Sequence, residues 1–188
     1  MRLEMNKNIF EGELVRLTAE DPEINGKASS RWARDSEYMR LLDTEAAQVW
    51  SAKKFQQWFE KDLEQTRTDG VGFTIRTLDG NRLIGFVGIF DIQWAHGDGW
   101  VGIGIGERDE WGKGYGTDAM RVILRYAFTE INLHRVSLGV FSYNPRAICS
   151  YEKAGFKREG AGRGGVLRDG QRSNDLYMGI LRSEWEKL

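Results

Sequence analysis

The chain contains the stretch Trp111-Gly112-Lys113-Gly114-Tyr115-Gly116-Thr117, and the patterns on either side of it decide the fold. In residues 101–106 valine and isoleucine alternate with glycine, which predicts a strand with one face free of side chains. Apolar residues then recur at helical spacing from Met120 to Ile131, so an amphipathic helix is predicted directly after the glycines. The first amides of a helix lack partners within it, and glycines let an anion approach them closely. The stretch therefore predicts a phosphate site, to which Lys113 can add a positive charge.

Two other phosphate-binding loops do not match this stretch. A Walker loop requires Gly-Lys followed by Ser or Thr, but here Gly114 follows Lys113, and Gly106 lies one residue too far upstream. A Rossmann fingerprint reads G-x-G-x-x-G and has an acidic partner about 20 positions later. The run here is G-x-G-x-G without that partner. On spacing alone, a tight strand-to-helix connection without a ligand stays open as an alternative.

A second segment, residues 142–156, has the local signals of a short helix. Asn144 is a favourable N-cap, Pro145 suits the first helical position, and Gly155 is suited to end the helix. The sequence therefore predicts a helix between these residues, following a strand at residues 135–141.

Together the two segments resemble the GCN5-related N-acetyltransferase (GNAT) family. Its acyl-CoA signature is Gln/Arg-x-x-Gly-x-Gly/Ala, followed by an Asn and then by a Tyr just before Gly-Phe. Gly114 and Gly116 match the signature glycines, and Asn144 and Tyr151 match the later asparagine and tyrosine. Trp111 stands at the Gln/Arg position, which removes a side-chain donor from the pyrophosphate site but leaves the backbone amides.

The resemblance covers about residues 73–182, and the Trp-Gly-Lys-Gly-Tyr form is similar to the branch containing ribosomal-protein N-terminal acetyltransferases and spermidine acetyltransferases. It implies an α/β fold with a mixed, largely antiparallel central sheet and helices on both faces. Two strands, one before the glycine loop and one ending near Phe141, would splay apart around acetyl-CoA. Residues 1–188 would form one domain, with an N-terminal strand and acceptor-side helices in residues 9–70.

The resemblance also implies roles for individual residues. The loop amides would bind the pyrophosphate, and the glycines of the preceding strand would let the pantetheine arm lie along it. Asn144 can hydrogen-bond that arm, and Ala147 is small enough to let it pass. Tyr151, one turn later, would be the general acid that protonates the departing thiolate, with aromatic packing as its alternative role. The complete predicted cofactor site is Gly104, Ile105, Gly106, Trp111, Gly112, Lys113, Gly114, Tyr115, Gly116, Thr117, Asn144 and Ala147.

The acceptor amine must be neutral when it attacks the thioester. At pH 7 an α-amino group with a pKa of about 7.8 is roughly 14% neutral, whereas a lysine-type amine is about 0.04% neutral. An α-amine therefore needs little more than water as base, and a polyamine needs a stronger one. The candidate bases are Glu107, Asp91 and His96, each of which has a surface charge as its alternative role.

Residues 29–68 are helical in character and unusually rich in aromatic residues. Two interpretations stay open: either the rings pack the helices onto the sheet, or Trp32, Tyr38 and Trp58 line an acceptor pocket. The sequence also predicts a strand within 9–18 and a helix from Ala52 to Gln65 that is capped by Ser51. Two hairpins are predicted as well, one of strands 73–78 and 82–90, and a closing one of strands 156–167 and 173–181.

Composition limits the partners. The net charge of −1 gives no broad field toward nucleic acid or anionic membrane, and no apolar run approaches the roughly 20 residues of a membrane span. The first residues lack a signal-peptide pattern, and the single cysteine, Cys149, excludes an internal disulfide, so we expect a cytoplasmic protein. His96 and His134 lack metal-ligand spacing, so no metal site is expected.

The sequence thus predicts an acetyl-CoA-dependent N-acetyltransferase in which a primary amine attacks the thioester directly. The acceptor is a protein N-terminal α-amine or a small amine such as a polyamine, with a mild preference for the first because no strong acidic cluster is apparent. The alternative is a non-catalytic acyl-CoA-binding module, suggested by Trp111 and the missing base. A nucleotide-binding α/β protein is a third, more distant alternative, and a homodimer is an alternative to a monomer.

Overall fold

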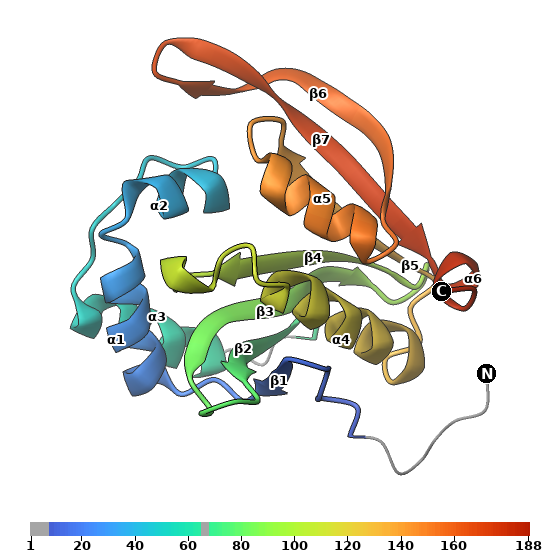
Figure 1. Ribbon diagram of the computed structural model, residues 1–188, viewed down its shortest axis with the longest axis horizontal. Coiled ribbons are helices and arrows are strands. Elements are labelled where there is room, and N and C mark those ends of the chain that lie inside the picture. The colour runs from blue at the N-terminus through green and yellow to red at the C-terminus, as the bar shows by residue number, and fades with distance from the viewer. Residues whose placement is uncertain (1–7, 65–67) are drawn as a thin grey trace.

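The computed structural model describes residues 8–64 and 68–188, and its centre is a seven-stranded sheet in the order β1-β2-β3-β4-β5-β7-β6 (Figure 1). The strands are β1 (Val15–Thr18), β2 (Val71–Thr77), β3 (Leu83–Gln93), β4 (Asp98–Ile105), β5 (Arg135–Phe141), β6 (Lys157–Arg168) and β7 (Gln171–Leu181). The helices are α1 (Pro22–Trp32), α2 (Ser36–Leu42), α3 (Ala52–Glu64), α4 (Tyr115–Thr129), α5 (Pro145–Lys153), α6 (Arg182–Trp185) and the short 3-10 helix η1 (Arg108–Glu110). All neighbouring strands are antiparallel except β4 and β5. The predicted mixed, largely antiparallel α/β fold is confirmed.

Strands β4 and β5 pair over a short length only. Asp98 to Trp100 pair with Arg135 to Ser137, and no pairing with β5 follows along the described remainder of β4. The carboxyl-terminal halves of the two strands therefore diverge, and the glycine loop and α5 follow directly after these diverging ends.

Helix α4 covers one face of the sheet. Its buried residues include Met120, Ile123, Leu124 and Phe128, which belong to the main hydrophobic core with side chains from the strands. Complete burial of one such side chain contributes about 1.5–3 kcal/mol to folding, so this core fixes the end of the sheet where the glycine loop lies. Ile103 and Ile105 of β4 pack against the same core from their side of the sheet.

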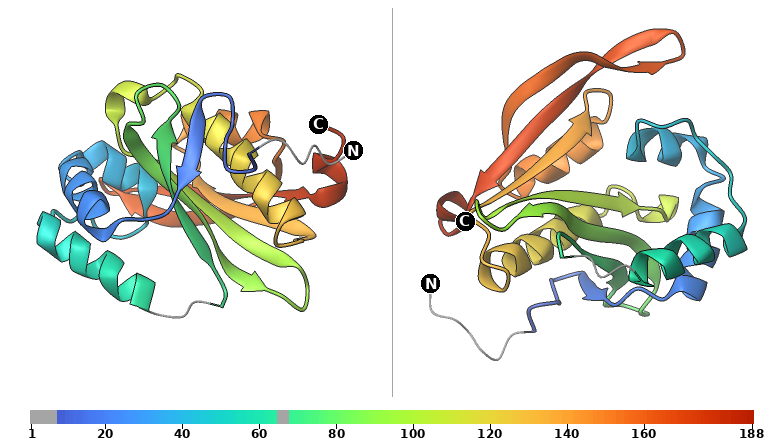
Figure 2. Two further views of the ribbon diagram at one scale, coloured as in Figure 1. Left: turned by 90° about the horizontal axis from the view of Figure 1, so that it is seen from below. Right: turned by 180° about the vertical axis from the view of Figure 1, so that it is seen from behind.

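The opposite side of β4 carries the glycines and faces the N-terminal helices (Figure 2). A second buried cluster there contains Trp32 and Tyr38, which pack against Phe86 of β3. A Cβ atom at Gly104 would lie 2.9 Å from the Tyr38 hydroxyl, and one at Gly106 would overlap the Trp32 ring. The bare face of the strand is thus occupied by aromatic side chains of the protein itself.

The local helix signals are confirmed. Asn144 caps α5 through a bond from the Ala147 amide to its side-chain oxygen (3.2 Å). Ser51 accepts a bond from the Lys54 amide (3.2 Å) at the start of α3, while the predicted end of that helix at Gln65 lies outside the described residues. The predicted strand 135–141 and both hairpins are present.

The predicted N-terminal strand and helical segments are present, with narrower bounds. The strand predicted within 9–18 is β1, while Glu11 forms an isolated bridge with Arg16 and the carbonyls of Ile9 and Glu11 accept hydrogen bonds from Arg125. The helical region 29–68 contains the end of α1 and all of α2 and α3; α1 ends at Trp32, and Asp35 then caps α2 through the Glu37 and Tyr38 amides.

The β6–β7 hairpin extends from the sheet toward α2 (Figure 1). Near its tip, Arg168 donates hydrogen bonds to the carbonyls of Asp43 and Glu45, at 2.7 and 3.0 Å. Asp169 at the turn pairs with Arg40 of α2 (2.5 Å). The hairpin therefore holds the segment that follows α2.

Candidate active site

The glycine loop leads into the N-terminus of α4. Gly112 and Gly114 have φ angles of 76° and 94°, in the left-handed region that side chains other than glycine's rarely adopt. Gly114 is the N-cap of α4, and nothing in the described chain lies within 4 Å of a Cβ atom built at Gly112. This open space beside the first helical amides fits an anionic group such as a pyrophosphate.

Asp118, in the first turn of α4, anchors one edge of this region. Its buried carboxylate accepts hydrogen bonds from the amides of Glu13 (3.1 Å), Leu14 (2.7 Å) and Val15 (3.0 Å). Three bonds to one charged group join the start of β1 to the helix that begins at the glycine loop. The loop is thereby fixed relative to the edge of the sheet.

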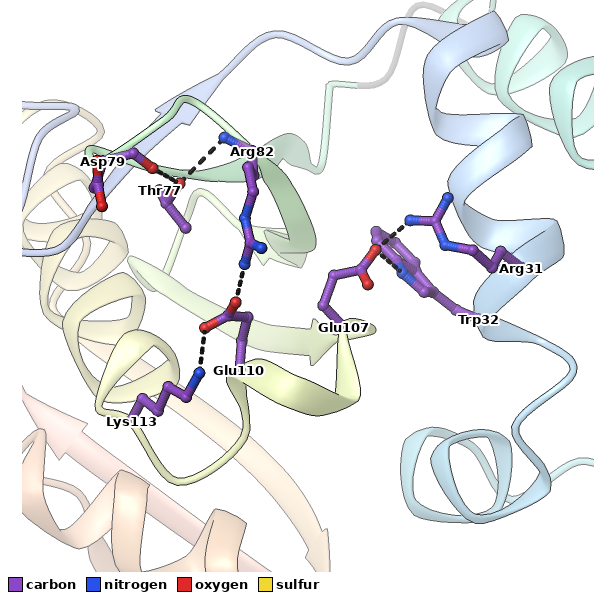
Figure 3. A network of polar contacts seen from close by, with 8 residues as sticks. All are labelled: Arg31, Trp32, Thr77, Asp79, Arg82, Glu107, Glu110 and Lys113. Atoms are coloured by element: carbon purple, nitrogen blue, oxygen red, sulfur yellow. Dashed lines mark hydrogen bonds and ion pairs between the residues drawn. The ribbon is translucent and has the colours of Figure 1, made fainter.

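Glu110 anchors the other side of the loop (Figure 3). This carboxylate is only 6% exposed and pairs with Arg82, which directly precedes β3, and with Lys113 of the loop, the latter at 3.3 Å. The Arg82 amide in turn donates to the Thr77 hydroxyl (3.1 Å). Lys113 is therefore engaged with a neighbouring carboxylate, and its charge is partly neutralised there.

A cavity of about 490 Å³ lies between the glycine loop, the end of β4 and α5. Of the residues predicted for the cofactor site and for catalysis, the following line it: Gly104, Ile105, Trp111, Gly112, Gly114, Tyr115, Gly116, Thr117, Asn144, Ala147 and Tyr151. Gly106 and Lys113 do not line it. The absence of a side chain at Gly106 makes room for the Trp32 ring, and Lys113 points to Glu110.

Trp111 is held firmly at the wall of this cavity. Its indole nitrogen donates to the Ile105 carbonyl (2.7 Å), and the guanidinium groups of Arg108 and Arg146 stack on its ring, at 4.5 and 3.7 Å from the ring centre. Arg108 is bound by the carboxylates of Asp35 and Glu37, at 2.7 and 2.8 Å. The indole therefore connects the loop to the end of β4.

Arg146, by contrast, lines the cavity, and its guanidinium stacks on the Trp111 ring. Stacking on an aromatic ring orients a guanidinium while leaving its N–H donors available. The tryptophan at the signature's Gln/Arg position thus presents an arginine from α5 to the same cavity.

Helix α5 presents the remaining predicted groups. The capping bond of Asn144 uses its oxygen, so the Nδ2 amide is the donor left for a ligand. Ala147 and Tyr151 follow at one-turn spacing and both line the cavity. Burial raises the pKa of the Tyr151 hydroxyl to about 12, so this phenol stays protonated at neutral pH. The Thr117 and Ser150 hydroxyls, 2.8 Å apart, join α4 to α5.

A second cavity of about 570 Å³ lies beside the first. Trp32, Tyr38 and Trp58, the aromatic residues expected either to pack or to line an acceptor pocket, all line it. Trp32 and Tyr38 are each 5% exposed, whereas Trp58 is 51% exposed. The residues common to both cavities are Tyr38, Leu41, Leu42, Ile103, Asn144 and Tyr151. Tyr151 thus stands where the two spaces meet.

Comparison with known families agrees with this geometry. The family model described as "Acetyltransferase (GNAT) domain" matches residues 13–157, a span that includes the glycine loop and Tyr151. The chain belongs to the GNAT acetyltransferase family.

Relatives of this GNAT acetyltransferase carry several descriptions. It is 34% identical over 135 residues to the probable N-acetyltransferase YjcK of Bacillus subtilis, covering 71% of each chain. It is 28% identical over 136 residues to the putative ribosomal N-acetyltransferase YdaF of the same organism, covering 72% of this chain and 74% of the relative. Its fold matches the crystal structure of spermidine N-acetyltransferase from Vibrio cholerae in complex with CoA and spermine, with a TM-score of 0.80, 24% identity and coverage of 92% and 98%.

None of the three candidate bases lines either cavity of this GNAT acetyltransferase. Glu107 accepts bonds from Arg31 and from the Trp32 indole nitrogen, the latter at 2.9 Å (Figure 3). Asp91 and His96 are exposed, at the end of β3 and in the turn before β4. The tertiary structure thus gives Glu107 a structural contact and leaves the acceptor amine without one of these bases beside it.

Three residues of the acetyltransferase site were not among the predicted site residues. Arg146 lies inside the segment that carries the α5 signals, but its partner Trp111 is distant in sequence. Asp118 gave the weak signal of an acid in the first helical turn, and Glu110 gave none. Among residues 8–64 and 68–188, no group of three or more His, Cys, Asp or Glu side chains could hold a metal ion. Within the same ranges, no helix combines the length and apolar character needed to cross a membrane.

Proposed function

We propose that this GNAT acetyltransferase transfers the acetyl group of acetyl-CoA to a primary amine by direct attack of the amine on the thioester. The observation that carries the proposal is the position of Tyr151 where the two cavities meet. A donor in the first cavity and an acceptor in the second would have this one phenol between them.

The first cavity has the groups that acetyl-CoA requires. The amides of the glycine loop and the α4 N-terminus would bind the pyrophosphate, and Arg146 would supply the charge that the signature's Gln/Arg side chain would otherwise give. The Asn144 amide would hydrogen-bond the pantetheine arm, which would pass over Ala147. The likeness to a fold that binds CoA supports this assignment.

The pKa of Tyr151 sets a condition on the chemistry. Proton transfer from a phenol with a pKa of about 12 to a thiolate whose thiol has an ordinary pKa of about 8.5 is unfavourable by roughly 3.5 units. The same burial that raises the pKa of the phenol would also raise the pKa of a thiol placed beside it, because both anions lose hydration. Tyr151 would therefore act as general acid only when the thiolate is held in the shared, poorly solvated space.

The acceptor is a primary amine, either a protein N-terminal α-amine or a small amine. The names of the relatives support both, since one is a putative ribosomal N-acetyltransferase and another fold relative is a spermidine acetyltransferase. We further propose a cytoplasmic enzyme with no nucleic-acid partner, in keeping with the net charge of −1.

A thiol-release assay with acetyl-CoA tests the proposal. The acceptors would be N-terminal peptides, polyamines and aminoglycosides, with the acetylated product identified by mass spectrometry. We expect stoichiometric release of CoA and acetylation of at least one amine. Binding of acetyl-CoA by calorimetry, combined with no acetylation across the panel, would refute the enzymatic function.

That refuting outcome would favour the second candidate, a non-catalytic acyl-CoA-binding module. The observation that favours it is that Glu107, Asp91 and His96 all lie away from both cavities. A binding module predicts that the biological output survives Tyr151→Phe but is lost when the glycine loop is altered.

A further inference from the structure

The second cavity has an aromatic lining drawn from several elements. Trp32 ends α1, Tyr38 lies on α2, and Trp58 lies on α3, while Phe86 comes from β3. Phe141 at the end of β5 also lines the cavity. Such a lining binds the carbon skeleton of a ligand through buried apolar area.

Charge is nearly absent from this lining. Its single ionisable acid or base, apart from tyrosine hydroxyls, is the carboxylate of Asp43, which is exposed. One oxygen of Asp43 accepts a hydrogen bond from the Glu45 amide (3.1 Å), so part of this carboxylate's hydrogen-bonding capacity is used within the local turn. Among the residues that the structure describes, no second carboxylate lines this cavity, so the lining can pair with one ammonium group at most.

We infer that the acceptor is a primary monoamine with an apolar or aromatic body, and not a polyamine; this rests on the proposed function. A polyamine would bring further ammonium groups into the cavity, and each would lose hydration without gaining a carboxylate partner. The apolar or aromatic body of a monoamine can pack against aromatic side chains such as those of Trp32 and Trp58. The volume of about 570 Å³ is in the range of sites for small ligands.

The apolar lining also affects how the acceptor amine loses its proton, since none of the three predicted bases lines this cavity. Moving an ammonium group from water to an apolar site disfavours its charged form, so the bound amine loses its proton more readily than in water. Tyr38 and Tyr151, the two phenols shared with the donor cavity, are both neutral at pH 7 because burial raises the pKa of each. Neither phenol offers a negative charge that would hold the amine as a cation.

Two classes of molecule carry a primary amine next to an aromatic body: a free arylalkylamine, and a peptide whose first residue is aromatic. The experiment compares phenethylamine, the peptide Phe-Gly-Gly and spermidine at saturating acetyl-CoA and fixed pH, with acetylated products quantified by mass spectrometry. We expect kcat/KM for phenethylamine or for the peptide to exceed that for spermidine by at least tenfold. Whichever of the two has the higher kcat/KM identifies the class of the acceptor. A kcat/KM for spermidine equal to or above both would overturn the inference while leaving the acetyltransferase function intact.

A matched pair of tryptophan variants localises the effect. Trp58 and Trp94 are similarly exposed (51% and 56%), but only Trp58 lines the cavity. Trp58→Ala should raise KM for the favoured amine at least fivefold and leave KM for acetyl-CoA unchanged, whereas Trp94→Ala should change neither. Equal effects of the two variants would contradict an acceptor site in this cavity.

A binding measurement separates this inference from the proposed function. Calorimetry on the CoA-loaded protein compares phenethylamine with spermidine and requires no turnover. Tighter binding of phenethylamine would support the specificity of the cavity even if no amine were acetylated. Tighter binding of spermidine would refute it.

Discussion

The guanidinium of Arg146 lies 3.7 Å from the centre of the Trp111 ring, which a second arginine, Arg108, also contacts at 4.5 Å. Arg108 is bound by two carboxylates, but Arg146 lines the donor cavity. This stacking gives a physical reason for a tryptophan where the family signature has a polar side chain. The ring positions a cation that comes from another helix.

Replacing this cation should weaken the binding of acetyl-CoA. Because hydrogen bonds to charged groups are worth about 1.5–3 kcal/mol, Arg146→Ala should raise the Kd for acetyl-CoA by roughly tenfold to a hundredfold. Arg34→Ala removes an exposed arginine that lines neither cavity and serves as the control. Calorimetry measures both, and an unchanged Kd for Arg146→Ala would mean that the loop amides hold the phosphates without it.

Removing the phenol of Tyr151 should affect turnover and not donor binding. General acid catalysis contributes about 10²–10⁴-fold, so Tyr151→Phe should lower kcat by about a hundredfold or more while the Kd for acetyl-CoA changes less than twofold. The ring remains, so the packing against Phe156, at 6.2 Å between ring centres, is preserved. Parallel losses in kcat and in acetyl-CoA affinity would instead indicate a packing role.

The raised pKa of Tyr151 predicts the shape of the pH profile. A phenol with a pKa of about 12 keeps its proton well above the pH at which an ordinary tyrosine, with a pKa of about 10, would lose it. The profile of kcat/KM should therefore rise with pH as the acceptor amine becomes neutral and show no descending limb up to about pH 10. Initial rates from pH 6 to 10 test this, and a descending limb near pH 9 that disappears in Tyr151→Phe would contradict it.

Two glycine substitutions should separate packing from ligand binding. Gly106→Ala would place a methyl group in the Trp32 ring, so we expect lower stability with little change in acetyl-CoA affinity for the protein that remains folded. Gly112→Ala meets open space but strains a backbone with a φ of 76°, and it adds a methyl group beside the proposed phosphate position. It should weaken acetyl-CoA binding more than Gly106→Ala does. Thermal melts with and without acetyl-CoA compare the two, and the reverse order would show that Gly106 contacts the cofactor.

Asp118 should contribute strongly to stability. Asp118→Ala removes three hydrogen bonds to backbone amides and leaves those amides without their partner, which we expect to cost about 3 kcal/mol. For a chain of this size the Tm should fall by roughly 6–12 °C. Asp109→Ala, at an exposed aspartate of η1, is the control and should change Tm by less than about 2 °C. A similar Tm for both variants would show that the anchor is dispensable.

The sequence alone determined the elements and the donor-side loop, because their signals act over a few residues. Alternating apolar residues predicted β5, Asn144 and Pro145 predicted the start of α5, and the glycines predicted the turn into α4. Each of these depends on backbone geometry and on hydrogen bonds within one or two turns. The resemblance to the family then supplied the expected function.

The tertiary structure decided which distant side chains meet. It stacks Arg146 on Trp111, binds Asp118 to the start of β1, and gives Gly106 a packing role beside Trp32. It also places the candidate bases outside both cavities. Such contacts depend on how β4 and β5 diverge and on how the N-terminal helices cover the glycine face. No pattern within a few residues encodes that divergence, so the second cavity could be recognised only after the chain was folded.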